Sequence, residues 1–192
     1  MATNAVKFKN DTPQLLFADH ATDFGAAPAT AANSLIIGTP TDVQMDLTGV
    51  AASGGAYQAA KADLGPSVWG EQVVYACLEF ETAPTDAGTV AFYWAASPSG
   101  TAGTGNPGGT TGSAGSFTDT VGNLGEMQFI GLLPVRNNVI AIGRVGIFLP
   151  DFRYGNLVVV NNADQALRST ATAMDETHIT MTPFVADIQA AA

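Results

Sequence analysis

The amino-acid sequence predicts an all-β protein: an antiparallel two-sheet β-sandwich of the jelly-roll type with an extended N-terminal segment. Short runs of β-branched and aromatic residues recur at spacings of roughly 8–15 residues, which is typical of strands. Gly, Pro, Asn and Asp bound most of these runs, as expected of turns. No stretch has the periodicity of a convincing amphipathic helix. We expect about eight to ten strands, a number that suits a sandwich or jelly roll.

The beginning of the chain combines strand signals with a long segment that lacks them. Val6 and Phe8 alternate with two lysines, and the run PQLLFAD follows. Residues 18–34 are rich in Ala and Thr and contain a single large apolar residue, Phe24, which is typical of an arm or long loop. We therefore predict two parts, residues 1–34 as an N-terminal strand with an extended arm or loop and residues 35–192 as the sandwich.

Two weaker segments precede the centre of the chain. Val43, Met45 and Leu47 alternate with polar residues, the pattern of a half-buried strand. Residues 55–65, GAYQAAKADLG, admit a short helix because of their alanines. The glycines at both ends and the following Pro66 favour a strand.

The strongest strand signals lie in the centre and in the last third. Residues 71–82 (EQVVYACLEFET) and 89–97 (TVAFYWAAS) are separated by APTDAG, which predicts a hairpin. Alternation places the large residues of the second run on one side, where we expect core. Four later strands are apolar on both faces over part of their length, as in a sandwich interior. Their sequences are EMQFIGLLPV, VIAIGRVGIFLP, NLVVVNN and THITMTPFV, and the core residues expected in the second run are Val90, Phe92 and Trp94.

Charge and composition restrict the partners. The formal net charge is −10 with only seven Lys and Arg residues, whereas nucleic acids and anionic membranes attract clustered cations. We therefore expect neither partner. Only 12% of the residues are charged, about half the usual share. Such a surface is typical of interface cores, but a weakly charged, well-solvated β protein remains equally open.

Signals for export or membrane insertion are not found in the sequence. Its first residues lack the apolar region of a secretory signal, and no run approaches about 18 apolar residues. Cys77 is the single cysteine, so no internal disulfide can form, as expected of a protein made in a reducing cytoplasm. Its neighbours, VVYACLEF, favour a buried thiol over a nucleophile.

The glycine-rich tract 100–115 contains the G-x-G-x-x-G spacing at Gly103–Gly108. A dinucleotide loop must follow a strand, open a helix and precede an acidic residue about 20 positions later. No helix pattern follows here, and Pro107 interrupts the motif. We interpret the tract as a mobile connection between strands and expect no cofactor-binding residue.

Catalytic groups are few. The histidines are His20 and His178, and alternation with Ile179 predicts an exposed or edge position for His178. Glu79 and Glu81 lie two apart on one strand face, but no partner acid can be identified at the separation of about 5–9 Å that glycosidases use. We expect a charged strand end there and predict no catalytic residue.

Aspartates near His20 could act as ligands for a hard cation such as Ca²⁺. The calcium-loop spacing D-x-[DN]-x-[DN]-G is absent, so a solvated acidic loop is favoured. Two further aspartates, four apart on a strand, would lie about 13 Å from each other, too far to share one ion. We predict no metal site and no cofactor. The aspartates of the first group are Asp11, Asp19 and Asp23, and those of the second are Asp42 and Asp46.

The order of several motifs resembles that of small virion structural proteins of tailed bacteriophages. The resemblance covers residues 57–189, about two-thirds of the chain. Its most specific pieces are PTDAGTVAFYWAAS and RYGNLVVVNN, followed at the end by HITMTPFVADIQ. Proteins of this group resemble jelly-roll modules on the capsid surface or at the tail. The first sixty residues lie outside the resemblance.

The resemblance implies a non-enzymatic virion protein, a capsid decoration or head-fibre base module assembled in the host cytoplasm. It implies a homo-oligomer on the outer surface of the particle, bound to the major capsid protein, with Met1–Asn33 anchoring or swapping between subunits. The charge agrees with an outward position because packaged DNA would repel an acidic module. Two alternatives remain open: a tail or tail-fibre adaptor bound to tail proteins, and a carbohydrate-binding module that attaches to host glycans through Tyr57, Trp69 and Tyr93.

Overall fold

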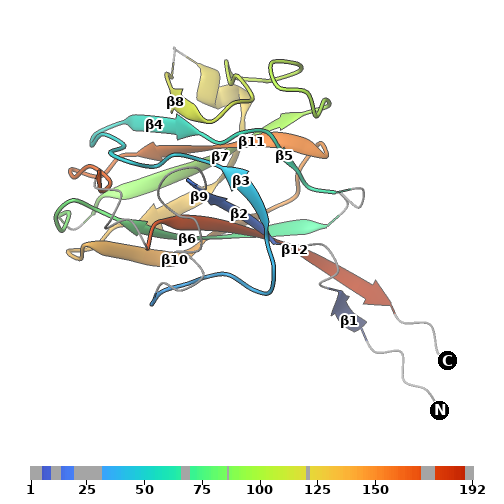
Figure 1. Ribbon diagram of the computed structural model, residues 1–192, viewed down its shortest axis with the longest axis horizontal. Coiled ribbons are helices and arrows are strands. Elements are labelled where there is room, and N and C mark those ends of the chain that lie inside the picture. Colours follow the sequence, from blue (N-terminus) through green and yellow to red (C-terminus); the bar gives the residue numbers. More distant parts are fainter. Residues whose placement is uncertain are drawn as a thin grey trace.

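The computed structural model of the chain describes residues 6–9, 14–19, 32–65, 70–85, 87–119, 122–169 and 176–188. These residues form two mostly antiparallel sheets that pack face to face (Figure 1). The helical content of the described residues is a single 3-10 turn at Asn123–Glu126. The strands are β1 (Val6–Lys9), β2 (Leu15–Ala18), β3 (Thr41–Gln44), β4 (Gly55–Gln58), β5 (Ala62–Asp63), β6 (Glu71–Glu79), β7 (Thr89–Ser97), β8 (Gly115–Phe117), β9 (Gln128–Pro134), β10 (Ile140–Phe148), β11 (Tyr154–Asn161) and β12 (His178–Ile188).

The strand order is that of a jelly roll. The first sheet runs β10-β6-β12-β2-β3, and the second runs β8-β4-β11-β7-β9. Strand β1 also pairs with β12 and strand β5 with β11, so each sheet has six described strands. Without β1, β3, β5 and β8, four strands remain in each sheet, and the chain passes repeatedly from one sheet to the other, as in an eight-stranded jelly roll. The predicted all-β two-sheet sandwich is confirmed. One pair departs from the antiparallel rule, because β2 and β3 run parallel.

The predicted hairpin between β6 and β7 is wrong. These strands belong to different sheets: β6 pairs with β10 and β12, whereas β7 pairs with β9 and β11. The turn residues between them reverse the chain but also carry it across the sandwich. Both strands need a hydrogen-bonded neighbour on each side, and in this fold those neighbours come from the last third of the chain.

The segment 1–34 contributes a strand to the sandwich. Strand β2 lies between β12 and β3, and its residues Leu15, Leu16 and Phe17 are buried. Strand β1 pairs with the end of β12, with Val6 opposite Ile188, in a two-stranded ribbon that leaves the body of the molecule (Figure 1). Most of the predicted arm at residues 18–34 falls outside the described residues.

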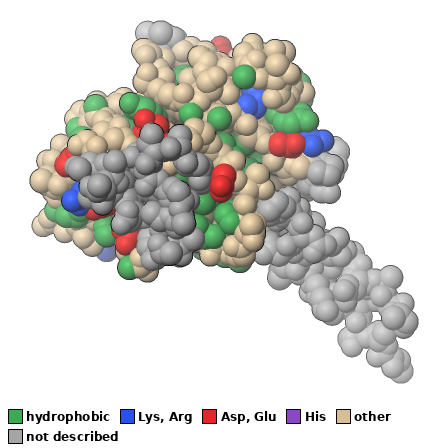
Figure 2. Space-filling model, in the orientation of Figure 1, with side chains coloured by type: hydrophobic (Ala, Val, Ile, Leu, Met, Phe, Trp, Pro, Cys, Tyr) green, Lys and Arg blue, Asp and Glu red, His purple; other side chains and the backbone are tan. Residues whose placement is uncertain are grey.

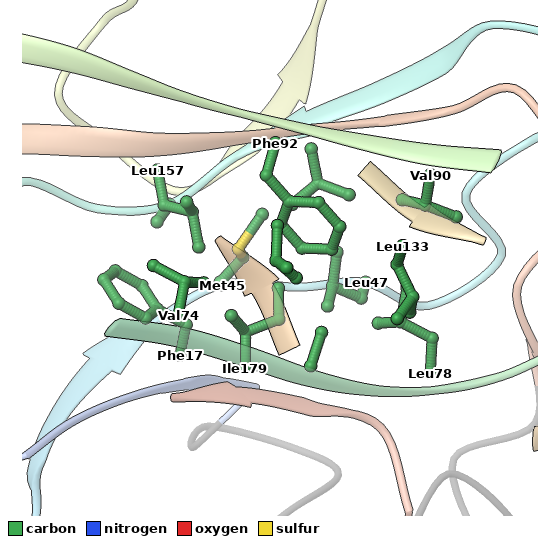
Figure 3. Close-up of a cluster of buried hydrophobic side chains, with 14 of the residues drawn as sticks. Phe17, Met45, Leu47, Val74, Leu78, Val90, Phe92, Leu133, Leu157 and Ile179 are labelled. Atoms are coloured by element: carbon green, nitrogen blue, oxygen red, sulfur yellow. The ribbon is translucent and has the colours of Figure 1, made fainter. Parts of the chain in front are cut away.

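The main core lies between the sheets (Figure 3). Phe92, Val90 and Leu157 from the second sheet meet Phe17 and Val74 from the first. The core position predicted for the large residues of β7 is confirmed, because Val90, Phe92 and Trp94 are completely buried. Burying each large apolar side chain contributes about 1.5–3 kcal/mol, so this cluster supplies the principal stabilisation of the fold.

The two sheets touch directly along one margin. A side-chain carbon on Gly131 of β9 would collide with the backbone oxygen of Val145, and one on Gly146 of β10 would collide with the backbone oxygen of Ile130. Strands β9 and β10 end different sheets and are consecutive in the chain. Glycine at these two positions therefore allows the backbone of β9 in one sheet to pack directly on the backbone of β10 in the other.

Candidate functional surface

The glycine-rich tract is a loop, as predicted, and the side chain of Lys61 holds it against the second sheet. The ammonium group donates to the hydroxyl of Ser97 at 3.0 Å and to the carbonyl oxygens of Thr101 and Thr104 at 2.9 and 2.8 Å. Desolvation lowers the pKa of Lys61. Composition alone indicates a mobile connection, and it does not reveal that a cation between β4 and β5, some forty residues earlier, binds this loop.

The loop does not present a phosphate cradle. It leads into strand β8 rather than a helix. The N–H group of Gly108, at the end of the motif, donates to the carboxylate of Glu126 at 2.9 Å. The carboxylate of Glu126 therefore occupies the hydrogen-bonding position that a bound phosphate would need at the N–H group of Gly108. Gln58 fixes the same loop by two hydrogen bonds with Thr111, both 2.9 Å long.

His178 is fully buried, so the prediction of an exposed or edge position is wrong. It faces outward from β12, but residues 32–40 cover it. The N–H group of Leu35 donates to Nε2 at 2.9 Å, and Nδ1 lies 2.8 Å from the carbonyl oxygen of Glu176. This arrangement requires a neutral ring that carries its proton on Nδ1. Desolvation lowers the pKa of His178, which favours the same neutral form.

A second polar side chain fastens the same covering segment. The amide of Gln14 accepts a hydrogen bond from the N–H of Ile37 at 2.9 Å and donates to the carbonyl oxygen of Leu35 at 3.2 Å. Together with His178 it satisfies backbone groups of residues 32–40, which have no strand partner. Both side chains therefore have a structural task.

Cys77 is buried, as predicted. It lies opposite His178 in the pairing of β6 with β12. Desolvation, followed by the charges of Glu176 and Glu79, raises the pKa of this thiol to about 12. Both ring nitrogens of the histidine already have backbone partners, so the two residues are not arranged as a nucleophile and its base.

The two carboxylates at the end of β6 hold the chain that precedes β12. Glu79 is buried and forms an ion pair with Arg168. Glu81 accepts hydrogen bonds from the backbone and the hydroxyl of Ser169, and these bonds lower its pKa. Each carboxylate therefore has a structural partner.

The aspartates considered as metal ligands are not gathered in the described part of the chain. Asp19 is buried and accepts a hydrogen bond from the amide of Gln44. Asp46 lies beyond the end of β3 and accepts one from the backbone of Thr48, while Asp42 is exposed on that strand. Within the described ranges no group of three His, Cys, Asp or Glu residues could hold a metal ion. Asp11, His20 and Asp23 lie outside them.

Two of the three aromatic residues considered for glycan binding are partly covered by the protein. Tyr57 is half-buried and packs against the main core. Tyr93 is half-buried as well, and its ring centroid lies 5.4 Å from that of Phe129. Trp69 lies outside the described residues.

Exposed apolar side chains gather instead on the outer side of the first sheet. Strand pairing sets Ile147 beside Val73 and Val73 beside Thr182, and in the next row Arg144 lies beside Tyr75. Ile142 and Ile147 remain 48% and 47% exposed. We call this region the apolar face and define it as Ile37, Glu71, Val73, Tyr75, Ile142, Arg144, Ile147 and Phe184.

A groove runs beside the centre of the apolar face. It has a volume of about 370 Å³ and lies between residues 32–40 and the surface of β6 and β12. Its apolar lining includes Ile37, Val73, Tyr75 and Phe184. Strand β10 is apolar on both faces over part of its length, as its sequence indicates, but only one of these faces lies in the core and the other faces solvent.

Charge is sparse on the described surface. In the view of Figure 2, the Lys, Arg, Asp and Glu side chains are few and lie singly or in small groups among polar and hydrophobic atoms. On the apolar face the charged residues are Glu71 and Arg144, one of each sign. The apolar face as a whole therefore carries no net charge, although the net charge of the protein is −10.

No protein-family model, curated protein or solved structure matches the chain. Among the described residues no helix is long and apolar enough to cross a bilayer.

Proposed function

We propose that the protein is a non-enzymatic structural component of a bacteriophage particle, a capsid decoration or head-fibre base module on its outer surface. In this role it binds copies of itself and other virion proteins, above all the major capsid protein. The apolar face is the observation that carries the proposal. A rigid sandwich with large apolar side chains left in solvent on one side is built to be covered by another protein.

The polar and titratable side chains of the candidate site residues have structural partners, which agrees with a non-enzymatic role. His178 and Gln14 fasten a covering segment, and Glu79 and Glu81 bind Arg168 and Ser169. Each of these groups stabilises the fold. Jelly-roll sandwiches serve as capsid and lectin domains, and a fold alone does not decide between such roles. Glycan binding receives less support than assembly because Tyr57 and Tyr93 pack into the protein.

Quantitative mass spectrometry of purified particles tests the proposal. A copy number close to that of the major capsid protein supports a decoration or head-fibre role on the outer surface. A copy number close to that of a tail ring supports the alternative, a tail or tail-fibre adaptor. Absence of the protein from particles would overturn both. Binding to a glycan array that is lost when Tyr57 and Tyr93 are replaced by Ala would instead favour host attachment.

A further inference from the structure

We infer that the apolar face binds a second copy of this chain, the two faces meeting reciprocally in a symmetric dimer. The inference names a partner for the surface that carries the proposed function, and in that sense it rests on that function. It is supported by the continuity of the face, by its charge, and by the symmetry of a contact between identical faces.

The first step is the continuity of the face. Ile147, Val73 and Thr182 form one row across three strands, and Arg144, Tyr75 and Thr180 form the next. Phe184 lies beside Glu71 at the end of the same side. These residues lie on three neighbouring hydrogen-bonded strands of a packed sheet, with β10 at its edge, so the face is formed before any partner arrives. A preformed surface loses little conformational entropy on binding.

The second step is the charge. A protein of net charge −10 repels its own copies over most approaches. The apolar face is an exception, since its Glu71 and Arg144 balance each other. A strongly basic partner would bury unpaired cations against its apolar residues, and a strongly acidic one would bury unpaired carboxylates, both at a high cost. An identical face brings one charge of each sign and is complementary to itself.

The third step is symmetry. In a two-fold dimer the same patch serves both subunits, so every contact occurs twice. Along β10, Arg144 lies between Ile142 and Ile147, whereas Glu71 lies at the end of β6. A reciprocal contact therefore buries Val73 and Ile147 of both copies and brings one positive and one negative side chain from each copy to the interface. Opposite charges of the two copies can then pair across the two-fold axis.

Paired variants on two neighbouring strands test the inference. Ile147 on β10 is 47% exposed and belongs to the apolar face, whereas Leu132 on β9 is 45% exposed and does not. The full chain and its variants Ile147→Asp and Leu132→Asp are compared by analytical ultracentrifugation over a range of concentrations. Ile142→Asp, also on the face, serves as a second variant in case Ile147→Asp does not fold.

The native chain is expected to sediment with twice the chain mass of 19.6 kDa. Ile147→Asp and Ile142→Asp are expected to raise the dissociation constant by roughly 100-fold or more, because each change enters the interface twice. Leu132→Asp is expected to leave it unchanged. A native chain that remains monomeric, or a dimer weakened equally by Leu132→Asp, overturns the inference.

The outcome is separable from that of the particle experiment. If the protein forms the dimer but is absent from particles, the virion role is rejected and the dimer interface stands. A monomer that is abundant in particles, and that detaches when Ile147 is replaced by Asp, would reject the second copy and assign the face to another virion protein.

Discussion

The outer sides of the two sheets are covered by the chain to different extents. Over most of the second sheet the chain covers itself: the glycine-rich loop, the 3-10 turn and Phe117 of the edge strand β8 enclose a second apolar cluster on β4, β11 and β7. Among the described strands of this sheet, only β9 keeps large exposed apolar side chains. Over the first sheet only part is covered, by residues 32–40, while β10 and the adjacent half of β6 remain open. The members of the second cluster are Ala56, Ala91, Ala95, Phe117, Met127, Val158 and Val160.

The difference shows that strands with two apolar faces can be accommodated in two ways. One sheet obtains its second cover from its own chain, through a loop that costs conformational entropy to order. The other keeps part of its apolar side open, where a partner can bury it. The same sequence signal, apolar residues on both faces, precedes both outcomes.

The largest effect is expected from Phe117, which is buried under the covered side. Phe117→Ala should lower the free energy of unfolding by about 3 kcal/mol through lost burial and the cavity that remains. The matched change Phe184→Ala on the open side should lower it by less than about 0.5 kcal/mol at low protein concentration. Urea denaturation followed by fluorescence measures both. Equal losses would contradict the distinction between the two sides.

The next effect concerns the loop that covers the second sheet. Lys61→Met removes the ammonium group that binds two carbonyl oxygens and a hydroxyl, and should cost about 1–2 kcal/mol. Hydrogen exchange should accelerate at residues 101–112 and remain unchanged in β6. Arg136→Met, which removes an exposed cation elsewhere, provides the control. Unaltered exchange in the loop would show that Lys61 does not hold it in place.

A smaller, pH-dependent effect is expected where residues 32–40 cover the first sheet. His178 has a folded-state pKa below its ordinary value of 6.5, so below pH 6.5 the unfolded chain binds the proton more readily. Stability is therefore complete above that pH and declines as the pH falls toward the folded pKa, by at most about 1.4 kcal/mol per pH unit. Cys77, Glu79 and Glu176 face or flank this ring.

Urea denaturation of the native chain and of His178→Gln between pH 7.5 and 5 isolates this contribution, because an amide does not titrate while the carboxylates of both proteins do. The difference in unfolding free energy between the two should shrink as the pH falls. A constant difference over the whole range would mean that the ring is not held neutral by its contacts.

The smallest effect is expected at the boundary between covered and open parts of the first sheet. Tyr75 and Cys77 are successive outward-facing residues of β6. Tyr75 is exposed, whereas Cys77 is completely buried. Its thiol, with a pKa of about 12, should react with iodoacetamide at pH 8 far more slowly in the folded protein than in urea. Mass spectrometry of the alkylated chain reports this. Rapid labelling of the folded protein would place the boundary elsewhere.

Local sequence patterns predict which face of a strand is apolar but not what will lie against that face. Alternation correctly places Val90, Phe92 and Trp94 in the core. The same reasoning fails for His178, because the segment that covers it comes from 143 positions earlier in the chain. For β10 it identifies the apolar outer side but not that this side is left in solvent. The link between Lys61 and the glycine-rich loop is equally invisible, since nothing in the spacing of these residues indicates contact.

The bare backbone contact between β9 and β10 has a mechanical consequence. Along that margin no layer of side chains separates the two sheets, so they cannot slide or part there without breaking a tight fit. Gly131 and Gly146 thus act as the fixed side of a hinge. Thermal opening of the sandwich should begin at the far margins, β3 and β8, and spread inward from those strands.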